Sequence, residues 1–238
     1  YDGMIIKYTV NGNVEWGKEI GGSSDDRITC ITETIDGDYV VGGHFSSSSI
    51  DLESQITLNN NGERNGMIIK YGSNGKIEWG NVVGGKKSEQ ITCIINAKEG
   101  GYVVGGHFSS SSLNFENGTE LNNKGSSDGM IIKYGSNGEV EWGNVIGGNK
   151  DDEITSIIET SEGGYIAVGN FMSSNIRLQN KVELINYGYR DGMIVKCSKS
   201  GIIEWGSKVG GENNDQINSI IEISNRSYIV GGDFESTS

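Results

Sequence analysis

The chain has 238 residues with 38 glycines, no proline and a formal net charge of −13. This acidity argues against nucleic acid as a partner, because nucleic acid attracts clustered basic surfaces. No apolar run approaches the roughly 18 residues that a membrane helix needs, so membrane insertion is not expected.

The heptapeptide DGMIIKY at residues 2–8 recurs with small changes at 65–71, 128–134 and 191–197, in steps of 63 residues. Three aromatic anchors keep the same spacing without insertion or deletion. They are Trp16, Trp79, Trp142 and Trp205; Tyr39, Tyr102, Tyr165 and Tyr228; and Phe45, Phe108, Phe171 and Phe234. A fixed period of this kind predicts a repeat architecture.

Apolar residues alternate with a period of two inside each unit, which is typical of half-buried strands. Met4, Ile6 and Tyr8 share one face of the first strand, and an Asn11-Gly12 turn follows it. Four strands are predicted per unit; their first copies cover residues 3–8, 13–20, 28–34 and 39–45. A double glycine ends the second of these strands.

A long connection follows the last of these strands, as at residues 46–64. It carries an apolar i, i+2 pair and then a leucine in three units: Ile50, Leu52 and Leu58; Leu113, Phe115 and Leu121; Ile176, Leu178 and Leu184. This pattern predicts small added strands or a hairpin that packs over the main strands.

Four short antiparallel strands at a fixed period describe the blades of a β-propeller. A solenoid is the second choice, but its units are usually shorter and its end units differ from the others. We therefore expect an all-β fold, a β-propeller with four four-stranded blades in a single domain, 1–238. The units cover about 1–20 plus 212–238, 21–83, 84–146 and 147–211.

The chain starts with the last two strands of a unit and stops after the first two. Residues 1–20 are therefore expected to complete the blade begun by Ile217–Phe234 and to close the ring, which removes exposed sheet edges. Two alternatives stay open, namely half of an eight-bladed ring built by two chains and a segment of a longer array. Monomer and homodimer are both compatible with these predictions.

The string EWGKEIGGSSDDRITCITETIDGDYVVGGHF at residues 15–45, followed by a DGMIIKY strand, resembles a known unit. It is similar to the Gly-Gly…Asp…Asp-Gly-Tyr…Gly repeats of bacterial secreted and cell-surface β-propeller proteins. The resemblance covers essentially the whole chain. It implies the propeller architecture and a secreted or cell-surface location in a bacterium. The longer loop after each GGHF-type strand departs from the usual unit.

Recognition is expected on the face that carries the double-glycine loops and the long connections, because long loops on a rigid scaffold often bind ligands. The third long connection differs most from the others, with INYGYRDG at residues 185–192. Arg177, Tyr187, Tyr189 and Arg190 are the candidate ligand-binding residues, since tyrosine and arginine are enriched in binding hot spots. Ordinary loop divergence is the competing interpretation.

One acidic residue follows the double glycine in every unit: Asp26, Glu89, Asp152 and Asp215. In a closed ring these carboxylates could form a circle near the axis and hold a hard cation through oxygen ligands. The alternative is that each carboxylate accepts backbone N–H bonds from its own loop. No other cofactor is expected.

Histidine occurs only at His44 and His107, where the other units carry Asn170 and Asp233. A catalytic base would not be exchanged in this way, which argues against enzymatic use.

We therefore expect a non-enzymatic binding or scaffolding module that recognises a protein or a glycan, with repeated weak sites that add avidity. The alternatives are a carbohydrate-active enzyme with an axial pocket, which would need two differently tuned carboxylates, and a purely structural assembly subunit.

Overall fold

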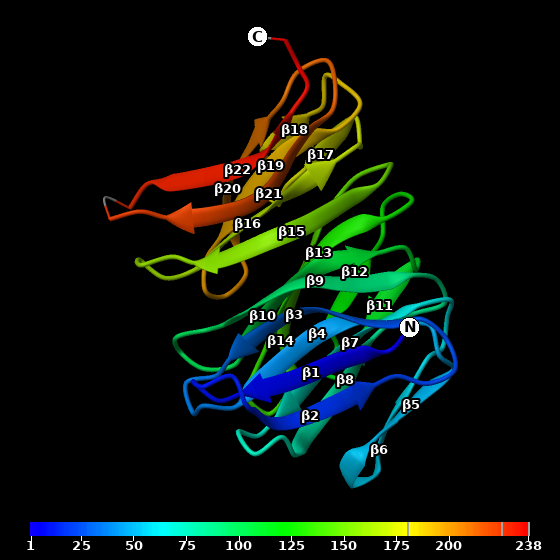
Figure 1. The fold of residues 1–238 in the computed structure, drawn as a ribbon. Coiled ribbons are helices and arrows are strands. Elements are labelled where there is room, and N and C mark those ends of the chain that lie inside the picture. Colours follow the sequence, from blue (N-terminus) through cyan, green and yellow to red (C-terminus); the bar gives the residue numbers. More distant parts are fainter. Residues whose placement is uncertain (180, 225, 238) are drawn as a thin grey trace.

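A computed structural model describes residues 1–179, 181–224 and 226–237 of the chain. Over these ranges the protein is built from antiparallel β-sheets, and its single helix is a short 3-10 turn, Glu53–Gln55. Within the same ranges, no helix has the length and apolar character needed to cross a membrane. The predicted all-β class is confirmed, and Figure 1 shows the sheets following one another along the molecule.

Three sheets contain four strands each, ordered as the strands follow in the chain. The first sheet contains β3 (Asp26–Glu33), β4 (Tyr39–Phe45), β7 (Asn65–Tyr71) and β8 (Ile77–Val83). The second contains β9 (Glu89–Asn96), β10 (Tyr102–Phe108), β13 (Asp128–Tyr134) and β14 (Val140–Ile146). The third contains β15 (Asp152–Glu159), β16 (Tyr165–Phe171), β19 (Asp191–Cys197) and β20 (Ile203–Val209). The four predicted strands of the unit are therefore present.

Two half-sheets flank these three sheets. One consists of β1 (Gly3–Tyr8) and β2 (Val14–Ile20), the other of β21 (Asp215–Glu222) and β22 (Tyr228–Phe234). The predicted closure is not present, because β1 pairs only with β2 and β22 only with β21 in the described sheets. Each half-sheet instead packs on its neighbouring full sheet, and three full sheets separate the two (Figure 1).

Consecutive sheets pack face to face through apolar side chains, and their first strands lie closest together. β3 contacts β9, β9 contacts β15, and β15 contacts β21, whereas the outer strands β8 and β14 make no comparable contact in the described structure. The sheets therefore fan out from a line of first strands. Clusters such as the one around Phe108, Met130 and Tyr134 fill the space between two sheets.

A β-bulge in the first strand links each sheet to the next. The register shifts between Ile28 and Cys30, so Thr29 is the extra residue. Its hydroxyl donates to the Ile91 carbonyl of the next sheet at 2.5 Å, and Thr92 and Thr155 repeat the bond. The bulge also requires glycine opposite it, because a Cβ on Gly43 would lie 2.0 Å from the carbonyl oxygen of Arg27.

The repeated tryptophan joins the outer parts of neighbouring sheets. Trp16 Nε1 donates to the Ser73 carbonyl at 3.2 Å, and its ring covers Gly75, whose φ is +77°. A side chain at Gly75 would collide with this indole. Trp79 and Trp142 make the equivalent bonds to the following turns, at 3.3 and 3.0 Å.

The long connections fold into hairpins, as the apolar pattern predicts. The hairpins are β5 (Ser49–Leu52) with β6 (Ile56–Asn59), β11 (Ser112–Asn114) with β12 (Glu120–Asn122), and β17 (Asn175–Arg177) with β18 (Glu183–Ile185). Ile50 lies opposite Leu58, both are buried, and β6 contacts the outer strand β8 of the same sheet. The connections are thereby anchored to the scaffold.

Candidate functional site

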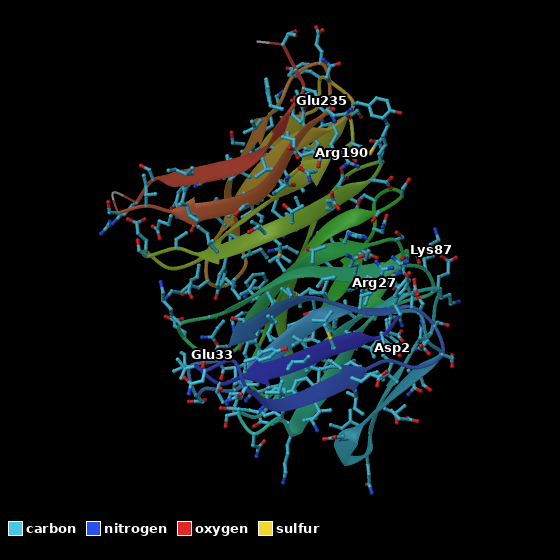
Figure 2. All side chains as sticks on the ribbon, viewed as in Figure 1. Asp2, Arg27, Glu33, Lys87, Arg190 and Glu235 are labelled. Carbon is cyan, nitrogen blue, oxygen red and sulfur yellow. The ribbon has the colours of Figure 1, made fainter. Side chains whose placement is uncertain are left out.

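The double-glycine loops and the long connections lie on one side of the molecule. Figure 2 shows Asp2, Arg27, Lys87 and Arg190 toward this side, whereas Glu33, at the end of β3, points to the opposite side. We call the first side the long-loop face, defined by residues 21–25 and 46–64 and their copies in the other units. The double-glycine loops and the long connections therefore share one face, as the sequence predicts.

The long connections latch each sheet to the next on this face. Arg64 forms a parallel bridge with Ser88, and its carbonyl accepts the Glu89 N–H at 2.8 Å. The bridges Ser127–Asp151 and Arg190–Asn214 repeat this contact. The long-loop face is therefore a continuous surface that crosses the junctions between sheets.

The four repeated acids are each surrounded by donors from their own unit. The buried Asp152 accepts the N–H groups of Gly148, Met172 and Ser173 and the Ser173 hydroxyl, at 2.6–3.1 Å. Asp26 and Asp215 repeat this set, and Glu89 repeats two of its three backbone bonds, from Gly85 and Ser110. This carboxylate clamp, which ties the double-glycine loop to the start of the long connection, matches the alternative that sequence reasoning offered.

The same acids do not form a shared site. Among the described residues, no group of three or more His, Cys, Asp or Glu side chains is arranged to hold a metal ion. A cation at Asp26, Glu89, Asp152 and Asp215 stays a prediction. Sequence reasoning missed the serine of the clamp, although a serine recurs 21 residues after each acid, at Ser47, Ser110, Ser173 and Ser236.

Burial changes the acidity of the carboxyl groups near this face. It raises the pKa of Asp128 to about 6, and the negative charge of Asp152 adds to the effect. Burial also raises the pKa of Asp152, although the hydrogen bonds of the clamp oppose it. At Asp215 burial acts in the same direction, but hydrogen bonds from Ser236 and the backbone outweigh it, and the pKa is lowered.

A cavity of about 230 Å³ opens on the long-loop face at the junction of the second and third sheets. Its lining residues are His107, Ser109, Ser127, Asp151, Asp152, Glu153, Asn170 and Arg190. His107 Nδ1 and Ser127 Oγ are buried without a hydrogen-bond partner in the described structure. Burial lowers the pKa of His107, so its ring is neutral at pH 7 and offers one donor and one acceptor.

The polar position at the end of the second main strand has a structural role in one unit. Asn170 Oδ1 accepts the N–H of Ile217 from the next sheet at 2.8 Å. His107 occupies the equivalent position without such a bond through Nδ1. Sequence reasoning used the exchange of residue type at this position only as an argument against a catalytic base and did not connect the position with a cavity.

The four candidate ligand residues lie along the third long connection, but the structure does not gather them into one site. Arg190 lines the cavity, and its guanidinium contacts Met172 Sδ at 3.8 Å. Tyr187 and Tyr189 are exposed, and Lys208 Nζ lies 4.5 Å from the ring centre of Tyr187. Arg177 is exposed on β17 and lies 3.9 Å from Glu183.

A second cavity, of about 680 Å³, lies between the hairpin of the second sheet and the outer strand of the first. Phe115, Tyr134 and Val140 are among its lining residues, together with Asn81 and Asn117. Both amide nitrogens donate to backbone carbonyls at 2.6 Å, Asn81 to Gly138 and Asn117 to Val140. These two side chains of the lining therefore already form hydrogen bonds within the protein.

Comparison with known proteins adds no family to this description. The chain matches none of the protein-family models against which it was scanned, and none of the curated proteins that were searched.

Proposed function

We propose that the chain is an arc of consecutive β-propeller blades and acts as a non-enzymatic binding module for a glycan. The glycan would bind on the long-loop face, with one sugar unit in the cavity between the second and third sheets. The fan of sheets around neighbouring first strands supports the propeller assignment, since propeller blades radiate in this way.

The observation that carries the proposed function is the cavity lined by Arg190 and His107. Its volume of about 230 Å³ is below the range typical of drug-sized ligands, about 300–1,000 Å³, and suits one small polar group. A sugar ring presents hydroxyls that both donate and accept, and the carboxylate, amide, imidazole and guanidinium groups of the lining complement them. The unpartnered His107 Nδ1 and Ser127 Oγ are polar atoms that such hydroxyls would satisfy.

Binding without turnover is supported by the state of the buried acid in this cavity. Glycoside hydrolysis uses two carboxyl groups that act on the substrate. Both oxygens of Asp152 already accept hydrogen bonds within its own unit, so this group serves the scaffold. The exposed rings of Tyr187 and Tyr189 give further apolar surface on the same connection for a longer glycan.

A glycan array with the purified chain tests the proposal, followed by titration of the glycan that binds best. Arg190→Ala is expected to weaken binding about tenfold, equivalent to 1.4 kcal/mol. Arg177→Ala is the matched control, because it removes an exposed arginine of the same connection that does not line the cavity, and it should leave binding unchanged.

Three results would contradict the proposal. One is an array without any bound glycan. Another is cleavage of the bound glycan, detected by its products, which would favour the carbohydrate-active enzyme. The third is a protein partner in pull-down experiments whose binding, rather than that of a glycan, depends on Arg190.

A further inference from the structure

The larger cavity, between the outer strand β8 of the first sheet and the hairpin β11–β12 of the second, contains a buried hydroxyl without a partner. Tyr134 lines this cavity and is only 2% exposed, and its hydroxyl oxygen has no hydrogen-bond partner in the described structure. Phe115 and Val140 supply apolar lining. The volume of about 680 Å³ lies within the range of about 300–1,000 Å³ that is typical of small-molecule sites. We call it the hairpin cavity.

The equivalent position between the second and third sheets is joined by a pair of amides. Asn144, on β14, donates through Nδ2 to the Gly201 carbonyl at 2.7 Å, and its Oδ1 accepts from Gln179 Nε2 at 3.0 Å. Gln179 belongs to the turn of the hairpin β17–β18. The Asn144 oxygen therefore receives a donor from the protein itself.

The equivalent position between the half-sheet β1–β2 and the first sheet is joined by an ion pair. Lys18, on β2, takes the place of Asn144, and Glu53 takes the place of Gln179. Lys18 Nζ lies 2.6 Å from Glu53 Oε1. Within this repeat an ammonium group on a carbon stem therefore already lies between an outer strand and the next hairpin.

The hairpin cavity has neither of these pairs. Asn81 and Glu116 occupy the two equivalent positions, and both line the cavity. Asn81 Nδ2 donates to the Gly138 carbonyl at 2.6 Å, as its equivalent Asn144 does to Gly201, which leaves Oδ1 as an acceptor. Within the described part of the chain Glu116 has no hydrogen bond or ion pair. Two acceptors cannot bond to each other, whereas an ammonium group, with three N–H donors, can bond to both.

The apolar lining of the hairpin cavity also favours a cation. Phe115 stands where the other two hairpins carry Leu52 and Leu178. Tyr134 lies in the same lining, whereas the third sheet has Cys197 at this position. An aromatic ring attracts a cation near its face, and an aliphatic side chain does not. Of the three hairpin positions described, this one alone combines two aromatic rings with a carboxylate that has no protein partner.

Charge adds to this preference. Glu116 and Glu139 both line the cavity, and none of its described lining residues is lysine or arginine. The chain as a whole has a net charge of −13. A small cation is therefore attracted to this site over a longer range, and added salt weakens that part of the attraction.

We propose that the hairpin cavity binds a small organic molecule with a primary ammonium group on an apolar stem. The ammonium group donates to the Glu116 carboxylate and to Asn81 Oδ1, in the position equivalent to that of the Lys18 ammonium. The stem packs against Phe115, and a second polar group on the ligand bonds to the Tyr134 hydroxyl. This site is separate from the proposed glycan site, because the two cavities share no lining residue.

A ligand-observed NMR titration with aminohexanol tests the proposal. This probe is a six-carbon chain with an amine at one end and a hydroxyl at the other. It should bind at low salt with a dissociation constant of about 1 mM or below. Hexanediol, which has the same chain length but no charge, should bind at least about tenfold more weakly, because it forms no charge-assisted hydrogen bond.

Glu116→Gln should weaken the binding of aminohexanol at least about tenfold. The amide removes the negative charge and can donate to Asn81 Oδ1, as Gln179 does to its partner in the next unit. Asn81→Lys should have the same effect, because it places an ion pair like that of Lys18 in the cavity. Both variants use residue types that the repeat already carries at these positions, so their urea unfolding curves should overlap with that of the wild type.

Glu120→Gln is the matched control, because Glu120 is an exposed carboxylate of the same hairpin that does not line the cavity. It should bind aminohexanol like the wild type. A wild type that shows no saturation up to about 10 mM, tenfold above the expected dissociation constant, overturns the proposal. Equal binding of hexanediol also overturns it, since the ammonium group would then contribute nothing. So does an equal loss for Glu120→Gln and Glu116→Gln, which would mean long-range attraction without a site.

Discussion

The full sheets and the half-sheets contain almost the same residues at equivalent positions, yet their side chains have different surroundings. Phe171 is fully buried and Phe234 is 60% exposed, although both end the second main strand of a unit. The carboxylate clamp is present in both, but the pKa is raised at Asp152 and lowered at Asp215. Burial at a repeat position therefore depends on the presence of the neighbouring sheet as much as on the residue itself.

The largest difference is expected for the repeated phenylalanine. Phe171→Ala leaves a cavity between packed sheets and should lower the free energy of unfolding by about 3–5 kcal/mol. Phe234→Ala should cost far less in dilute solution, because most of this side chain is already in water. Urea unfolding at low protein concentration checks both. Equal losses for the two variants would contradict the comparison.

Removing a carboxylate from the clamp should have the next largest effect. Asp152→Ala removes the side-chain acceptor of the Gly148 N–H and of the Ser173 N–H and hydroxyl, whereas the Met172 N–H keeps the Asp151 carbonyl, and it should lower the free energy of unfolding by about 3 kcal/mol. Asp215→Ala should cost less, because Glu235, which supplies one of its donors, is exposed and can bond to water instead. Denaturant unfolding of both variants measures the two losses in the free energy of unfolding. A larger loss for Asp215→Ala than for Asp152→Ala would contradict this prediction.

A gain in the free energy of unfolding, rather than a loss, is expected from a substitution at Asp128, where the first full sheet carries Asn65. The raised pKa means that the carboxyl group favours folding below about pH 4, and this contribution is lost as pH rises through about 6. Asp128→Asn should therefore stabilise the protein at pH 7 by about 2 kcal/mol and change little at pH 3.5.

The physical basis of this prediction is visible at Asn65. With its amide nitrogen turned toward the Arg64 carbonyl and Glu89 Oε2, the side chain donates at 3.2 and 3.3 Å. Asp128 Oδ1 is instead buried without a partner among the described residues. Unfolding curves from pH 3.5 to 8 measure the difference. Parallel pH profiles for Asp128→Asn and the wild type would show that this group does not titrate in the expected range.

The smallest effect is expected at the tryptophan contact. Trp142→Phe removes the bond to the Lys199 carbonyl and should cost about 1 kcal/mol. Trp205→Phe should cost less in the isolated chain, because Trp205 has no equivalent acceptor within the described structure. If the two changes cost the same, the bond to Lys199 contributes nothing measurable.

The strands and hairpins could be predicted because alternation is local and four copies reinforce it. Ile50 and Leu58 face each other across a hairpin, as the apolar pairs indicate. The open arrangement of the half-sheets could not be predicted in the same way. It depends on the angle between sheets, which side-chain packing and the Thr29 bond to Ile91 set, and alternation carries no information on that angle.

The candidate site was predictable in place but not in detail. The length of the connections predicted the long-loop face, and the divergence of the third connection pointed to Arg190. The cavity with His107, Ser127 and Asn170 brings together residues from adjacent units, so no single unit contains it. The clamp serines were detectable from their spacing, but only because each recurs in every unit.

The uniform bonds between first strands make whole units interchangeable. Removing residues 84–146 would join Val83 to Gly147 in place of the identical Gly84 and would bring Thr29 to the Ile154 carbonyl in place of that of Ile91. The molecule can thus be shortened or lengthened by 63 residues with every type of junction retained. Loss of a single strand would instead break the junctions on both sides, so variation in such a chain is restricted to steps of one complete unit.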